Sequence, residues 1–252
     1  MKRFAMYLVT ALLSVGLAGP ASAYFEDFDA HANGTSAFTL AGWSNPFSGT
    51  GTVEVSTEQS VSGANSLKLI DATAGTHAFV DLADAAILGG AFSGTGVLVM
   101  EFDYYYQSSG GAMFAIALGS AGTTNDENQL ARLAPYEPNM SDENGWFGPN
   151  GDGVPSTPSN TWVHVKIILD ADNETVQYDF DGNVTNPTRG WGGGPLGVGP
   201  SATDVGYLDL RPISGDGASY VDNLSISIIP EPSAMALLAG GGILALVRRR
   251  RA

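Results

Sequence analysis

The segment Val97–Tyr106 most constrains the fold, because its ten residues alternate between two kinds of side chain. One set is apolar or aromatic and recurs at every second position: Leu98, Met100, Phe102, Tyr104 and Tyr106. Glu101, Asp103 and Tyr105 lie between them and face the other way, since successive side chains of a β-strand point to opposite sides. The pattern predicts a strand that covers an apolar core with one face.

Short segments of similar character recur along the chain, each bounded by Gly, Ser, Asn or Asp. They are 24–29, Thr52–Ser56, Ser66–Ile70, 78–82, 113–118, 162–169, Thr175–Phe180, 205–210 and 219–228. We expect 113–118 to form an antiparallel hairpin with Val97–Tyr106, and 119–160 to form a long loop. Helical periodicity is absent over three turns, except in 81–88. The sequence predicts an all-β fold, an antiparallel two-sheet sandwich over residues 24–229.

Both ends of the chain differ from this middle part. Lys2 and Arg3 precede an apolar stretch, and Ala21-Ser22-Ala23 has the small side chains of a cleavage site. Residues 1–23 are therefore predicted to be a signal peptide that signal peptidase removes.

The C-terminal residues 230–252 form the second unusual segment. Pro230, Glu231 and Pro232 precede the uncharged run 233–247, and then come Arg248, Arg249, Arg250 and Arg251. As a helix the run would be roughly 22 Å long, less than the ~30 Å hydrocarbon core of a bilayer. Arginine clusters stay on the cytoplasmic side, so residues before this short hydrophobic helix would lie outside.

This arrangement closely resembles the PEP-CTERM sorting signal of Gram-negative bacteria, on Pro230, Glu231, Pro232, the apolar run and the arginines. The resemblance covers about a tenth of the chain. It implies recognition by an exosortase at the inner membrane, loss of the tail, and delivery to the cell surface or the extracellular polysaccharide matrix. The alternative is a C-terminal membrane anchor that is never processed.

Charge excludes some partners of the predicted body. Without Lys2, Arg3, Glu231 and the four tail arginines, 5 basic and 25 acidic residues remain, a formal charge of −20. Such a body repels nucleic acid and anionic lipid, and it attracts divalent cations. Solubility of an exported protein explains the same excess. The chain has no cysteine, so no disulfide supports the fold.

The body also resembles concanavalin-like, laminin-G and carbohydrate-binding jelly rolls. The resemblance rests on Phe25-Glu26-Asp27-Phe28, on 162–167 leading to Asp179-Phe180-Asp181-Gly182, and on Tyr220-Val221-Asp222-Asn223-Leu224. It implies a jelly roll whose first and last strands lie side by side, without proving that the body binds sugar.

Asp222 is the first candidate for a site. In a regular strand it would share the core face with Leu224 and Ile226, where a lone charge costs several kcal/mol unless it is paired. Glu26 or Asp27 could complete a structural calcium site with it, as in related carbohydrate-binding jelly rolls. The alternative is a β-bulge at Asp222-Asn223 that turns the carboxylate outward.

Aromatic residues of the long loops are the second candidate. Trp146, Phe147, Tyr136 and Trp191 could form a platform on which sugar rings stack, since flat rings suit the apolar face of a pyranose. Alternatively they pin the loops onto the sandwich. Oxygen-bearing side chains around Trp146 suit calcium but lack the spacing of an EF-hand.

Catalysis is the third possibility. Glu101-Phe102-Asp103 is similar to the Glu-x-Asp of jelly-roll glycoside hydrolases, but tyrosines stand where the second glutamate should be. Histidines are scattered, and no serine or metalloprotease motif occurs. We therefore predict a non-catalytic body that is structural or binds polysaccharide, with a glycoside hydrolase-like enzyme as the alternative.

Overall fold

The computed structural model describes residues 22–45, 49, 51–70, 76–82, 84, 86–88, 96–107, 111–118, 129–133, 158–170, 175–184, 205–213 and 217–229. Within them the chain forms two antiparallel β-sheets and one short 3-10 helix, η1 (Ala37–Thr39). The predicted all-β two-sheet sandwich is confirmed.

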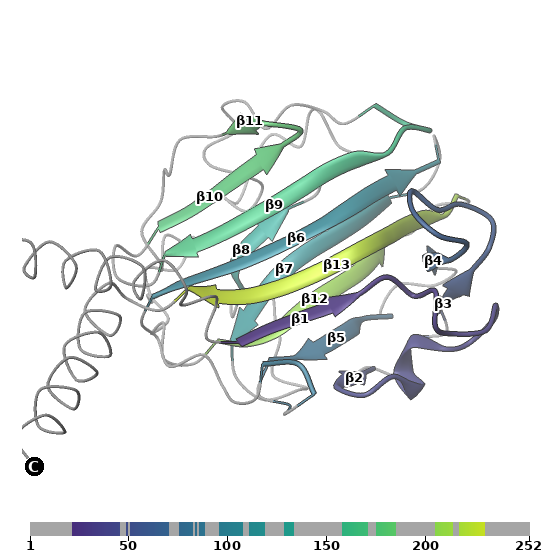
Figure 1. Cartoon of the computed structure of the whole chain (residues 1–252), viewed down its shortest axis with the longest axis horizontal. Coiled ribbons are helices and arrows are strands. Elements are labelled where there is room, and N and C mark those ends of the chain that lie inside the picture. The colour runs from purple at the N-terminus through teal and green to yellow at the C-terminus, as the bar shows by residue number, and fades with distance from the viewer. Residues whose placement is uncertain are drawn as a thin grey trace, which may run out of the picture.

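The larger sheet has eight strands, all paired antiparallel. Its order is β11 (Asn183–Val184), β10 (Thr175–Phe180), β9 (Val163–Asp170), β6 (Val97–Tyr106), β13 (Ser219–Ile229), β4 (Ser66–Ile70) and β3 (Thr52–Ser56). The eighth strand, β1 (Ser22–Glu26), pairs with β13 beside β4. The first and last strands therefore lie side by side, as the jelly-roll resemblance implied (Figure 1).

The smaller sheet has five strands and lies behind the larger one in Figure 1. Its order is β2 (Trp43–Ser44), β5 (Ala78–Asp81), β12 (Val205–Ile213), β7 (Gly111–Leu118) and β8 (Gln129–Leu133).

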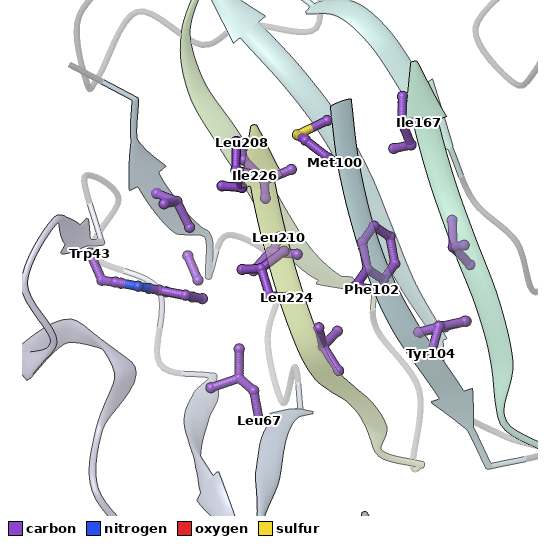
Figure 2. Close-up of a cluster of buried hydrophobic side chains, with 14 of the residues drawn as sticks. Trp43, Leu67, Met100, Phe102, Tyr104, Ile167, Leu208, Leu210, Leu224 and Ile226 are labelled. Carbon is purple, nitrogen blue, oxygen red and sulfur yellow. The ribbon is translucent and has the colours of Figure 1, made fainter. Parts of the chain in front are cut away.

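The core fills the space between the two sheets. On β6 the apolar stripe is buried as expected, with Met100, Phe102 and Tyr104 fully inaccessible to solvent. Figure 2 shows these side chains together with Leu208 and Leu210 of β12, from the other sheet. Because both sheets contribute one apolar face, the opposite face of the larger sheet is left for polar and aromatic side chains.

The expected hairpin between Val97–Tyr106 and 113–118 is wrong. β6 pairs with β9 and β13, whereas β7 lies in the other sheet between β12 and β8. Both edges of β6 are occupied by long strands that continue its apolar stripe, so no edge remains for its neighbour in sequence. Pairing between residues far apart in the chain has overridden the local turn.

Three short strands were missed and several boundaries are shifted. β8 lies inside the segment 119–160, which was expected to be a loop; β2 and β11 have only two residues each. Of 81–88, Asp81 ends β5 and the other described residues form turns and a bend rather than a helix. β1 begins at Ser22, two residues before the predicted mature N-terminus.

The sorting motif, the apolar run 233–247 and the four arginines lie outside the described residues. In the part of the chain that the structure describes, no helix has the length and hydropathy to cross a bilayer.

Candidate functional site

Asp222 lies on the outer face of the larger sheet, not on the core face. A β-bulge shifts the register: Asp222 is opposite Asp103 on β6, whereas Ser225 is opposite Glu101. From Asp222 to Ser225, β13 advances three residues while β6 advances two. Asn223 lies within this bulge and has a left-handed φ of 52°. The structure has the bulge that the sequence left open as the alternative.

Asp222 is nevertheless 0% exposed, because the segment 57–65, here called the 57–65 loop, lies over it. Its Oδ2 accepts hydrogen bonds from the backbone N–H groups of Val61 (2.9 Å) and Ser62 (3.2 Å), and Oδ1 accepts one from Asn223 N–H (2.8 Å). Burial raises the pKa of this carboxyl, and the three hydrogen bonds oppose that rise.

The other predicted calcium ligands have partners of their own. Glu26 accepts a hydrogen bond from Phe28 N–H (2.8 Å) and lies 3.3 Å from Nε2 of His31. Asp27 accepts one from the backbone N–H of Asp29 (3.1 Å). Among the described residues no group of three or more His, Cys, Asp or Glu side chains is arranged to hold a metal ion. These contacts do not form a ready cage, so calcium at Glu26, Asp27 and Asp222 stays a prediction.

Aromatic rings gather at one end of the same outer face, near the C-terminal end of β6. The rings of Tyr105 and Trp162 are both half-buried, with centroids 5.4 Å apart and planes tilted by 45°. Tyr220, which is buried, meets Tyr105 edge-on at 5.8 Å and donates a hydrogen bond to Glu58 Oε2 (2.7 Å). Tyr105 and Trp162 therefore present apolar ring surface that a fixed third ring supports.

A polar row lies next to these rings. His164 Nδ1 is 3.0 Å from Asp103 Oδ1, and Asn223 Nδ2 donates to Asp103 Oδ2 (2.8 Å). The other ring nitrogen of His164, Nε2, is 3.8 Å from Glu101 Oε2. Lys166 Nζ is 2.5 Å from Glu101 Oε1. About half of the His164 side chain (46%) is exposed. We name the rings Tyr105 and Trp162 with this row the outer-face site.

Trp146, Phe147, Tyr136 and Trp191 lie outside the described residues, so the structure does not test the platform predicted from them. Sequence reasoning missed the ring pair of Tyr105 and Trp162. The alternation of β6 already placed Tyr105 beside Asp103 and Glu101, but nothing in the sequence shows that β9 brings Trp162 and His164 alongside.

A second ionisable cluster lies in the smaller sheet. His77 Nδ1 is 3.0 Å from Asp209 Oδ2, and Arg211 Nη2 donates to the same oxygen (3.3 Å). Asp209 is fully buried and His77 nearly so. The carboxylate of this cluster is therefore inaccessible to solvent.

No family model and no curated protein matches this chain. Solved structures match its fold. A sialidase is 12% identical with a TM-score of 0.50, and the match covers 83% of this chain but 19% of the sialidase. A carbohydrate esterase from Shiga toxin-encoding bacteriophage phi24B is 14% identical with a TM-score of 0.49, covering 83% and 98%. The CBM22-1 xylan-binding domain of Paenibacillus barcinonensis Xyn10C is 14% identical with a TM-score of 0.44, covering 85% and 99%.

Proposed function

We propose that this chain is an exported, non-catalytic β-sandwich that binds a polysaccharide through the outer-face site. The observation that carries the proposal is the ring pair Tyr105 and Trp162 beside the polar row of Asp103, His164 and Asn223. Aromatic rings stack on the apolar face of a sugar, and polar groups that are held by hydrogen bonds to one another can hydrogen-bond its hydroxyls. Its residues lie on β6, β9 and β13, except Trp162, which directly precedes β9, so the sheet holds most of its geometry.

Binding is tested by replacing Trp162 with alanine in the full-length chain. We expect affinity for a bound polysaccharide to fall about tenfold, because one lost stacking contact of about 1.4 kcal/mol corresponds to that factor. Affinity electrophoresis through gels that contain the polysaccharide measures it.

Phe25→Ala is the matched control. Phe25 is 61% exposed, and the register of β1 places it on the same sheet face opposite Ser225, away from the rings. Unchanged mobility of the Trp162 variant, or an equal loss in both variants, would count against the proposed site.

Export and sorting are part of the same proposal and rest on the chain ends. We propose that signal peptidase removes residues 1–23 and that an exosortase removes the tail, so that the body reaches the surface of a Gram-negative cell or its matrix. Pro230 directly follows Ile229, the last residue of β13, and has no N–H to donate to a neighbouring strand.

The intact mass of the protein recovered from the cell surface tests this route. It should lack both the signal peptide and the four terminal arginines, whereas the variant with Pro230 and Pro232 replaced by alanine should keep the arginines. A surface protein that retains them would instead be the unprocessed membrane anchor.

A glycoside hydrolase-like enzyme is the second candidate, favoured by Glu101 and Asp103 on one face of β6. The contacts of His164 argue against it, because its imidazole lies 3.0 Å from Asp103 and 3.8 Å from Glu101 and so engages both carboxylates. Release of reducing ends from a β-glucan, abolished by Glu101→Gln, would establish the enzyme.

A further inference from the structure

Within the described strands of the larger sheet, the lysines of the outer face are paired. These eight strands contain two lysines, Lys68 and Lys166, one histidine, His164, and no arginine. Lys166 forms an ion pair with Glu101, and Lys68 forms one with Glu58. On these strands a lysine becomes available to an anionic sugar only if one of these pairs breaks.

The acceptor capacity of the site points to a ligand that donates hydrogen bonds. Asp103 Oδ2 accepts one hydrogen bond, from Asn223. Asp103 Oδ1 accepts one from His164 in the tautomer that has its proton on Nδ1. A carboxylate oxygen can accept two, so each retains one acceptor position. Sugar hydroxyls donate to such positions, whereas the carboxylate group of a uronate or a sulfate group has only acceptors and is repelled by the Asp103 carboxylate.

The carboxylates near the outer-face site do not make it a binding site for positively charged ligands. Those nearest to the rings already have partners. Asp103 accepts from Asn223 and lies 3.0 Å from His164 Nδ1. Glu101 forms an ion pair with Lys166, and Glu58 forms one with Lys68 and accepts from Tyr220. A polycation would compete with these contacts, so the paired charges favour a ligand without charge.

We propose that the outer-face site takes an uncharged, hydroxyl-rich polysaccharide and rejects polyuronates. One pyranose ring stacks on Trp162 and Tyr105, and hydroxyls of the next residue donate to Asp103. This inference rests on the proposed function, because it assigns a ligand class to the same site.

The test compares three polymers on the full-length chain at low and high ionic strength: mixed-linkage β-glucan, alginate and chitosan. We expect β-glucan to bind at least about tenfold more tightly than alginate, with an affinity that changes less than about twofold with salt, since screening acts on charge pairs. Tighter binding of alginate or chitosan, weakening with salt, would overturn the ligand class while leaving polysaccharide binding intact. Binding of none of them, with neutral mannan and xylan also inactive, would overturn both proposals.

A charge variant tests the cause of the rejection. Glu101→Gln removes the partner of Lys166, so we expect alginate binding to increase about fivefold or more at low salt. Glu54→Gln is the control: it removes the same charge from β3, three strands away from β6, and should leave alginate binding unchanged. An equal response of both variants would mean that net charge, not the freed lysine, controls the selectivity.

Discussion

Asn223 determines which face of the sheet Asp222 occupies. Its φ of 52° lies in the left-handed region, which asparagine tolerates better than most residues. The same side chain joins two parts of the molecule, because it donates to Asp103 and accepts from Ser62 Oγ (2.8 Å). One residue thus turns a buried carboxylate away from the core and links the 57–65 loop to the outer-face site.

Asp222→Ala should destabilise the protein by about 2–4 kcal/mol, because three backbone N–H groups would lose their acceptor in a buried place. Urea unfolding followed by circular dichroism measures the change. Asp27→Ala, which removes an acceptor of one exposed hydrogen bond, should cost under about 1 kcal/mol. Similar costs for the two variants would contradict the assigned role of Asp222.

Tyr24 predicts an alkaline loss of stability. Burial, more than any other cause, raises the pKa of Tyr24 from 10.0 to about 12. The folded state therefore binds this proton more tightly than the unfolded state: the stabilisation is complete below pH 10 and is lost as the pH rises toward 12. Between these values the free energy of unfolding should fall more steeply in the parent than in Tyr24→Phe. Parallel profiles would refute the prediction.

At the scale of elements, the 57–65 loop is held in place by three side chains: the acceptors Asp222 and Asp29 and the donor Tyr220. Asp222 takes the N–H groups of Val61 and Ser62, and Asp29 Oδ1 takes those of Ala64 (2.8 Å) and Asn65 (2.9 Å). Tyr220 reaches Glu58 at the beginning of the loop. The loop closes over β13 because side chains satisfy its backbone donors, not because it has regular structure.

Alanine variants of two glycines distinguish the effect of backbone strain from the effect of steric crowding in this region. Gly63 and Gly34 both have positive φ, 59° and 81°, so alanine is strained at either. A Cβ at Gly63 would also lie within 1.5 Å of Asp29 Oδ2, whereas one at Gly34 would meet nothing within 4 Å. Gly34→Ala should lower the free energy of unfolding by about 1 kcal/mol. Gly63→Ala should lower it clearly more, because the new Cβ would displace Asp29 from its hydrogen bonds. Equal melting temperatures of the two variants would show that Asp29 does not hold the loop.

For the molecule as a whole, pairing of β1 with β13 places the beginning of the predicted body beside its end. Ser22 is opposite Ile228, and Glu26 is opposite Leu224. The predicted signal peptidase site after Ala23 therefore lies within a strand, next to the point where the sorting motif begins. The protease would therefore have to cut this bond before β13 pairs with β1.

Calcium binding is a prediction about the whole fold, since the proposed ligands come from both ends of the chain. A ligand held only by the folded state raises its melting temperature. The sequence therefore predicts that calcium raises the Tm of the full-length chain relative to chelator, and that Glu26→Gln abolishes this shift. This variant keeps the oxygen that accepts from Phe28 N–H. Equal Tm values with calcium and chelator would remove the metal site.

The sequence by itself determined most of the longer strands, because alternation at period two depends only on neighbouring residues. Thr52–Ser56, Ser66–Ile70, Val97–Tyr106 and Thr175–Phe180 were predicted with the bounds that the structure has. The apolar stripe of β6 is likewise buried as predicted. The composition of the ends, and hence the prediction of export and sorting, also depends on the sequence alone.

Only the tertiary structure decided which strands pair and what their outer faces assemble. Loss of the expected hairpin, the bulge at Asn223 and the meeting of Trp162 with Tyr105 all depend on contacts between residues far apart in the chain. A one-residue change of register moves a side chain to the opposite face, so a pattern read along one strand cannot place Asp222. Burial of apolar area sets which strand edges are filled, and that choice created the outer-face site.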